Sequence, residues 1–215
     1  RIWIKQVLKT LKWLSVFLHG QRGALIRKWT FRSWLDPQSA LTMILDASPF
    51  GMGGVLVASD RIISFFSSDL TKDDVRIHRH EIGQDTGQQV WEALCILVAL
   101  RLWSSHWLGC QCTLTIKSDN ISALVMTSKL KITSSELIAQ ELALLLSEAS
   151  YMPRHVVHVP GVLNAWADAL SRLSDPSRKY AIPAELRDVP RAFPTRRSER
   201  FYSTLAAGDS RGGGV

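Results

Sequence analysis

The chain has few cysteines, no long hydrophobic run and no internal repeat, and each absence narrows the class of protein. Only three of its 215 residues are cysteine, an odd number whose spacing matches no zinc module, so we expect reduced thiols. The most apolar stretch, residues 93–100, is too short to span a bilayer. Lysines interrupt the apolar N-terminal segment, which excludes the pattern of a secretory signal. We therefore expect an intracellular protein, cytoplasmic or nuclear, that is not secreted and has no membrane partner.

Charge is distributed unevenly along the chain. The net charge is +7, and 46% of the residues are hydrophobic, which is typical of a globular protein. Residues 1–36 hold eight Lys/Arg and one acid, and residues 176–215 hold eight Lys/Arg and four acids. The middle of the chain holds ten Lys/Arg and fourteen acids. Basic flanks suit a polyanionic partner such as nucleic acid, although solvated segments that keep a chain soluble have the same composition.

These changes in composition divide the chain into three parts. Residues 1–36 have apolar positions at helical spacing and predict a helical extension. Residues 40–173 hold the segments of one α/β domain. Residues 176–215 contain recurrent Pro, Arg and Gly and predict an irregular, flexible tail. Because the sequence does not begin with Met, we expect it to be a piece of a longer protein.

Within the main domain, the pattern predicts three strands joined by short turns, then alternating helices and strands. The strands are expected at 41–47, 54–59, 61–67, 112–118 and 155–160, and the helices at 90–108, 121–130, 135–149 and 164–173. Residues 69–89 are polar, contain two glycines and predict a loop. The result is a mixed five-stranded sheet with helices on both faces.

Four acids lie in or next to these predicted elements, in four separate segments. Asp46 ends the first strand, Glu92 begins the long apolar helix, Asp119 follows the fourth strand and Asp168 lies in the last helix. Each has an ordinary explanation alone: a turn residue, a helix-dipole partner, an N-cap or a surface acid. If they converge, their repulsion needs a compensating charge, and divalent metal is the usual one. Glu81 is an alternative to Glu92, although the glycines that follow it disfavour a place on the long helix.

The four segments together resemble the ribonuclease H (RNase H) domain of retroelement reverse transcriptases. LDASPFGMGGVL resembles the first strand and hairpin of that family, and WEALCILVALRLW its glutamate-bearing helix. IKSDN resembles the segment with the third acid, and HVPGVLNAWADALSR the segment with the last acid. The resemblance covers about 41–173 and implies an RNase H-like fold.

The resemblance also implies chemistry and partners. It implies an endoribonuclease that cleaves the RNA strand of RNA/DNA hybrids with two Mg²⁺ ions, for which Mn²⁺ can substitute, and an attached reverse transcriptase domain in the parent polyprotein. Asp46 would bridge both ions, Glu92 and Asp119 would hold one, and Asp168 the other. Candidate substrate contacts are Ser48, Gly53 and Asn120.

Two departures from the family leave an alternative open. The segment before Asp168 is too short for the histidine loop of cellular relatives, and Lys129 and Lys131 are the only nearby candidates for a basic grip. The alternative is an inactive domain of the same fold with a structural or nucleic-acid-binding role. We expect Trp103 and Trp107 in the core, and base stacking is the less favoured interpretation. We expect the H-R-H at 78–80 in a polar loop, and metal binding is the less favoured interpretation.

Overall fold

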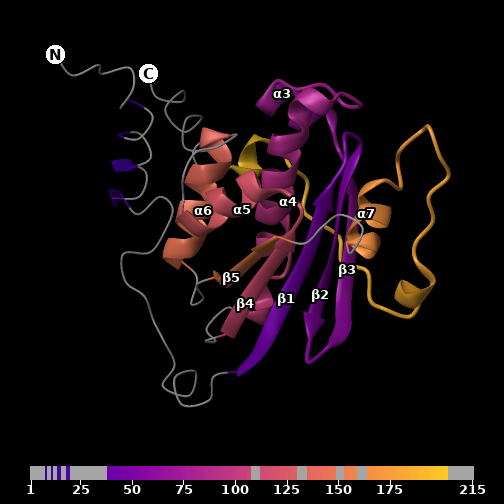
Figure 1. Cartoon of the computed structure of the whole chain (residues 1–215). Helices are drawn as coiled ribbons and strands as arrows, with labels where there is room; N and C mark the ends of the chain where they lie inside the picture. The colour runs from indigo at the N-terminus through magenta and orange to yellow at the C-terminus, as the bar shows by residue number, and fades with distance from the viewer. Residues whose placement is uncertain are drawn as a thin grey trace.

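A mixed five-stranded sheet forms the centre of the computed structural model (Figure 1). The structure describes residues 38–107, 112–129, 135–148, 153–158 and 164–202, with a few isolated positions between 8 and 19. The strand order is β3-β2-β1-β4-β5. The strands are β1 (Gln38–Ala47), β2 (Gly51–Ala58), β3 (Arg61–Asp69), β4 (Cys112–Ser118) and β5 (Pro153–His158). The α/β class and the mixed sheet are as the sequence predicts.

The hairpins β1–β2–β3 are antiparallel, whereas β4 runs parallel to β1 and β5 runs parallel to β4. Ile44 pairs with Lys117 in the β1–β4 register, so the carboxyl ends of both strands reach the same edge of the sheet. Asp46 lies at that end of β1, and Asp119 follows the last residue of β4. This register is what brings two acids that are far apart in the sequence to one edge.

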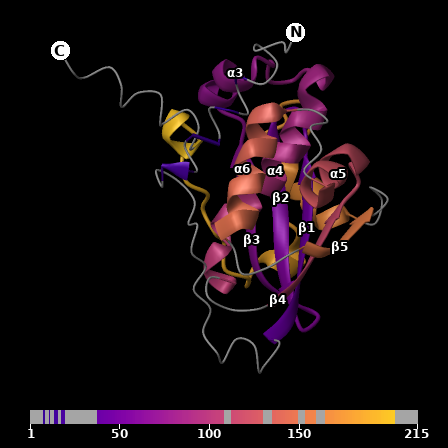
Figure 2. The same cartoon turned by 90° about the vertical axis from the view of Figure 1, so that its left-hand side faces the viewer.

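Helices α4 (Gln88–Leu102), α5 (Ile121–Lys129) and α6 (Glu136–Glu148) lie on one face of the sheet, as Figure 2 shows, and α4 contacts both other helices. Every residue from Val90 to Leu100 is buried, because the helix contacts β1 and β2 on one side and α5 and α6 on the other. This explains its apolar character all round. The helix ends earlier than the sequence predicts, and Trp103 and Trp107 are both 2% exposed, which places them in the core and excludes base stacking.

Helix α7 (Ala165–Ser171) covers the opposite face of the sheet, where it contacts β1, β2 and β3. The sequence predicts that Asn164 caps this helix, but its side chain makes no capping hydrogen bond. Its Nδ2 instead donates to the Leu45 carbonyl at 2.9 Å. A second, smaller apolar cluster forms on this face, and its buried members are Val55, Phe65, Leu170 and Leu186.

The polar segment 69–89, predicted as a loop, contains helix α3 (Lys72–His78). The sequence signal was a capping box: the Thr71 side chain accepts from the Asp74 amide, and the Asp74 carboxylate accepts from the Thr71 amide. His78 belongs to no group of candidate metal ligands among the described residues. Its Nε2 lies 2.8 Å from the Tyr202 hydroxyl, and burial lowers its pKa to about 4.

Residues 176–202, which we call the C-terminal arm, pack against the domain, whereas the flexibility expected of 176–215 stays a prediction. The arm is mostly irregular, with short 3-10 turns at Ala184–Leu186 and Glu199–Phe201. It pairs with the edge strand β3, where the Phe65 amide donates to the Pro190 carbonyl at 3.1 Å and the Ala192 amide to the Phe65 carbonyl at 2.8 Å. The arm therefore covers part of an otherwise exposed sheet edge.

A buried ion pair holds the end of the arm to α3. The Arg197 side chain is 3% exposed and the Asp74 side chain is fully buried, and Arg197 Nη2 donates to Asp74 Oδ2 at 2.8 Å. The same guanidinium donates to the Ser68 hydroxyl and to the Asp69 carbonyl. Tyr202 then closes the large apolar core beside Phe201.

Several predicted segments lie wholly or mostly outside the described residues. The helical extension 1–36 lies outside the described residues apart from isolated positions, as do residues 203–215, Cys110 and Lys131. Cys95 is a free, buried thiol. No helix in the described part of the chain combines the length and apolarity needed to cross a membrane.

We predict that Arg197→Ala lowers the free energy of unfolding by about 3–5 kcal/mol, because it leaves the Asp74 carboxylate buried without its cation. Arg196→Ala is the matched control, since Arg196 is 82% exposed and pairs with Asp73 at the surface. It is expected to change stability by about 1 kcal/mol or less. Urea unfolding of both variants checks this, and equal effects would show that the buried pair does not fasten the arm.

Candidate metal centre

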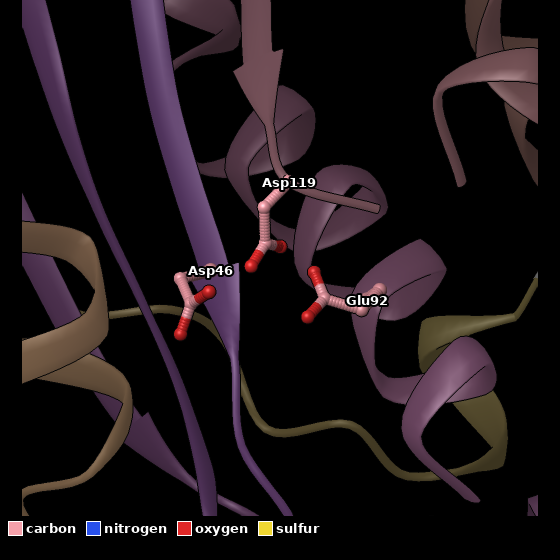
Figure 3. A group of neighbouring side chains, drawn as sticks. All are labelled: Asp46, Glu92 and Asp119. Carbon is pink, nitrogen blue, oxygen red and sulfur yellow. The ribbon is translucent and has the colours of Figure 1, made fainter. Parts of the chain in front are cut away.

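Three of the four predicted acids meet at the carboxyl edge of the sheet. One carboxylate oxygen from each of Asp46, Glu92 and Asp119 lies within 4.8 Å of the others, and no other group of this kind occurs among the described residues. Figure 3 shows the three side chains directed toward a common space from a strand, a helix and the loop after a strand. Asp46 is 4% exposed and Glu92 is 3% exposed.

Each of these acids has a different local support. Asp46 accepts a hydrogen bond from the Ser171 hydroxyl at 2.6 Å, so α7 holds one of its oxygens. Glu92 lies in the second turn of α4, and its Oε1 accepts from Gln88 Nε2 at 2.9 Å. Gln88 also donates to the Ala47 carbonyl and thereby links the helix to the end of β1. Neither Gln88 nor Ser171 was found from the sequence, although Gln88 stands four residues before Glu92 on one helix face.

Burial dominates the electrostatics of this centre. It raises the pKa of Asp46 from 3.8 to about 7, and the charges of Asp119 and Asp168 add to the rise. The hydrogen bond from Ser171 and the charge of Arg172 act in the opposite direction. Burial, followed by the charges of Asp46 and Asp119, also raises the pKa of Glu92 well above 4.5. Without a bound cation, burial therefore shifts Asp46 and Glu92 toward their protonated forms.

The arrangement fits a divalent cation. Glu92 Oε2 is buried and has no hydrogen-bond partner, and the same is true of Gln88 Oε1. A buried carboxylate oxygen without a partner is costly unless a cation or proton satisfies it. Carboxylate oxygens are the ligands that Mg²⁺ prefers, and the three acids offer them at one place. The residues present are therefore compatible with a magnesium or manganese site.

Asp168 is the fourth predicted acid, and it lies near this group but outside it. Its Oδ1 accepts a hydrogen bond from Arg172 Nε at 2.5 Å. Its charge still contributes to the raised pKa of Asp46. Glu81, the alternative to Glu92, is exposed and accepts from Gln84, so it does not face the other acids.

Two of the three predicted substrate contacts make internal contacts. Ser48 is 1% exposed, and its hydroxyl donates to the Ser171 carbonyl at 2.7 Å. Gly53 is buried against α7, where an added Cβ would lie 2.4 Å from the Leu170 Cβ. Both residues therefore dock α7 on the β1–β2 hairpin, and their contact with substrate stays a prediction.

Asn120 remains at the rim of the centre and is half-buried. Its Oδ1 accepts from the Ala123 amide at 3.0 Å, which caps α5, and its own amide donates to the Ser118 hydroxyl. The cap fixes Asn120 next to Asp119 at the start of α5.

Comparison with known proteins gives structural neighbours but no match in sequence. No protein-family model matches the chain, and no curated protein matches it. The chain is similar to RNase H1 from the archaeon Halobacterium salinarum (TM-score 0.42, 14% identity, 65% of this chain and 98% of that one). It is also similar to the N-terminal RNase H domain of a Mycobacterium tuberculosis protein, solved as a maltose-binding-protein fusion (TM-score 0.42, 14% identity, covering 61% and 95%).

A further neighbour is a foamy viral protease-reverse transcriptase in complex with double-stranded DNA. The TM-score is 0.31 and the identity 17%, over 85% of this chain and 27% of that one. The neighbours named here thus include RNase H domains and a viral reverse transcriptase. Scores and identities this low carry no argument about the chemistry, for which the evidence is the geometry of the acids.

We predict that the metal-free protein loses stability as the pH rises from about 4 to about 7. Over this range the folded state keeps a proton on Asp46 that the unfolded chain has released, because the folded pKa is about 7 against 3.8. The free energy of unfolding then levels off, about 2–4 kcal/mol lower in total. Glu92 acts in the same direction.

Asp46→Asn tests the assignment of this effect, because an amide does not titrate. In urea unfolding with chelator, we expect it to match the parent below about pH 4 and to be about 2–4 kcal/mol more stable near pH 8. Asp60→Asn replaces an exposed acid in the β2–β3 turn and should keep the parent's pH dependence. A pH slope that survives in Asp46→Asn would contradict the role of Asp46.

Proposed function

We propose that this domain is a metal-dependent endoribonuclease that hydrolyses the RNA strand of RNA/DNA hybrids. The observation that carries the proposal is the meeting of Asp46, Glu92 and Asp119, two of them almost fully buried, at the carboxyl edge of a mixed sheet. Buried acids that repel one another destabilise a fold unless they have a use for their charge, and binding of hard cations is such a use.

The cofactor of this function is a pair of Mg²⁺ ions, with Mn²⁺ as a substitute. Asp46, Glu92 and Asp119 would hold one ion, and Asp46 and Asp168 the other. When bound, such ions activate a water molecule and stabilise the leaving oxygen of an in-line displacement at phosphorus. The protein's own contribution is to hold the carboxylates: Ser171 orients Asp46, Gln88 orients Glu92, and the cap by Asn120 fixes the loop of Asp119.

The preference for RNA in a hybrid follows from the resemblance of the four motifs, and its physical basis would be contact with 2′-hydroxyl groups. Asn120 is the predicted substrate contact that remains at the rim. The basic flanks and an attached reverse transcriptase domain in a retroelement polyprotein would add affinity for the polyanion.

A second candidate is an inactive domain of the same fold with a structural or nucleic-acid-binding role. The observation that favours it is the ion pair between Asp168 and Arg172, which engages the fourth acid. Titration with Mn²⁺ in a calorimeter separates the two candidates, because an inactive domain that has lost its metal centre would bind no ion.

We predict that the chain cleaves a labelled RNA/DNA hybrid in Mg²⁺ or Mn²⁺, and that Asp46→Asn, Glu92→Gln and Asp119→Asn each reduce the rate by at least about a hundredfold. Loss of a residue that merely orients a metal ligand already reduces activity by about 10- to 100-fold, so loss of a ligand should do more. Gel analysis of the products measures the rate, with duplex RNA and duplex DNA as substrates expected to resist.

The matched control is again Asp60→Asn, which removes one exposed negative charge at the opposite end of β2 from the partner of Asp46 and should cleave like the parent. Cleavage that persists unchanged in Asp46→Asn would sink the proposed mechanism. Absence of both Mn²⁺ binding and cleavage would favour the inactive domain.

A further inference from the structure

The residue that follows α7 places a positive charge beside the fourth acid. Arg172 Nε donates to Asp168 Oδ1 at 2.5 Å, four residues along the same helix, and both side chains are 38% exposed. Arg172 also ends the helix, where its amide donates to the Asp168 carbonyl. The short backbone connection keeps the guanidinium close to this carboxylate.

Arg172 also lies next in sequence to a residue that holds a second acid of the centre. Ser171, the neighbour of Arg172, donates to Asp46 Oδ2. Two consecutive residues therefore contact two acids, one through a neutral hydroxyl and the other through a charge.

Asp168 differs from the other three acids in its distance from the centre. Asp46, Glu92 and Asp119 bring ligand atoms within 4.8 Å of one another, and Asp168 does not join them. Its charge nevertheless reaches Asp46. Asp168 is thus close enough to influence the centre while one of its oxygens is engaged by Arg172.

We propose that Arg172 is a resident counter-cation of the centre, which occupies Asp168 and lowers the affinity for the divalent ion that needs this carboxylate. The proposal rests on the two-ion function above and assigns a positioning residue to it. An ion held by Asp46, Glu92 and Asp119 does not require Arg172 to move. An ion that uses Asp168 must either displace the guanidinium or bind the other oxygen, and in both cases it stays near the positive charge.

The size of the effect follows from the exposure of the pair. A half-exposed ion pair within one helix is weak, because water screens it, so Arg172 can be displaced. The remaining repulsion between a guanidinium and a divalent ion is screened as well. We therefore expect Arg172 to weaken binding of the second ion by about three- to tenfold and to change binding of the first ion less.

Calorimetric titration of the whole chain with Mn²⁺ tests the proposal through binding rather than activity. The parent is expected to bind one ion more tightly than the other. Arg172→Gln removes the charge and should strengthen the weaker site by about three- to tenfold, whereas Arg172→Lys keeps the charge and should resemble the parent. Asp168→Asn should lose the weaker site and keep the stronger one.

Arg178→Gln is the matched control, because Arg178 is an exposed arginine six positions further on and its loss changes the net charge equally. Thermal unfolding in chelator confirms that each variant folds, and Arg172→Ala serves as a second charge-removing variant.

Two results would overturn the proposal, and they are distinguishable. If Asp168→Asn abolishes the weaker site but Arg172→Gln leaves its affinity unchanged, Arg172 is only a surface partner of Asp168 and the nuclease function stands. If no variant, nor the parent, binds Mn²⁺, the proposed function falls and takes this role of Arg172 with it.

Discussion

Repulsion between buried carboxylates at the carboxyl edge of the sheet is the constraint on which the rest of the structure depends. Asp46 and Glu92 are held almost out of contact with water, and burial and mutual charge raise both pKa values. A fold keeps such groups only if its backbone is fixed strongly enough elsewhere. Here the β1–β4 register, the buried helix α4 and the docking of α7 supply that rigidity.

The C-terminal arm contributes to the same rigidity at the β3 edge of the sheet. It pairs with the edge strand β3 and ends in the ion pair between Arg197 and Asp74. On its way it places Leu186 in the small cluster that also contains Leu170 of α7. The arm therefore belongs to the domain, and its apolar contacts cover the helix that carries Asp168 and Ser171.

The periodicity of apolar residues was sufficient to predict the type of the strands and of α4. The strands alternate or are apolar throughout, and α4 is apolar on all faces, so their types followed from pattern alone. The convergence of Asp46 and Asp119 followed from strand order, because parallel strands end at one edge. Glu92 was chosen over Glu81 because glycines follow Glu81, and the structure agrees.

The features that pattern missed depend on contacts between distant segments. The arm is rich in Pro and Arg, a composition typical of flexible tails, and only the partner Asp74, more than a hundred residues earlier, makes Arg197 a core residue. Gly53 and Ser48 stand beside Asp46 in the hairpin, which suggested contact with substrate. Both lie against the backbone of α7, and no local pattern predicts that a helix over a hundred residues later will dock there.

Helix α7 connects these observations. It carries one acid of the proposed centre, a hydroxyl that orients a second acid, and a guanidinium that opposes the charge of both. Because the three groups lie within five consecutive residues, a shift of the helix moves all of them together. Gly53 sets the distance of that helix from β2, since any side chain there would collide with the backbone at Leu170 and Ser171. Gly53 is also the cross-strand partner of Asp46, so one glycine lies between the acid of β1 and the helix that carries Asp168. The close approach of this helix to β2 therefore matters as much to the centre as the carboxylates themselves.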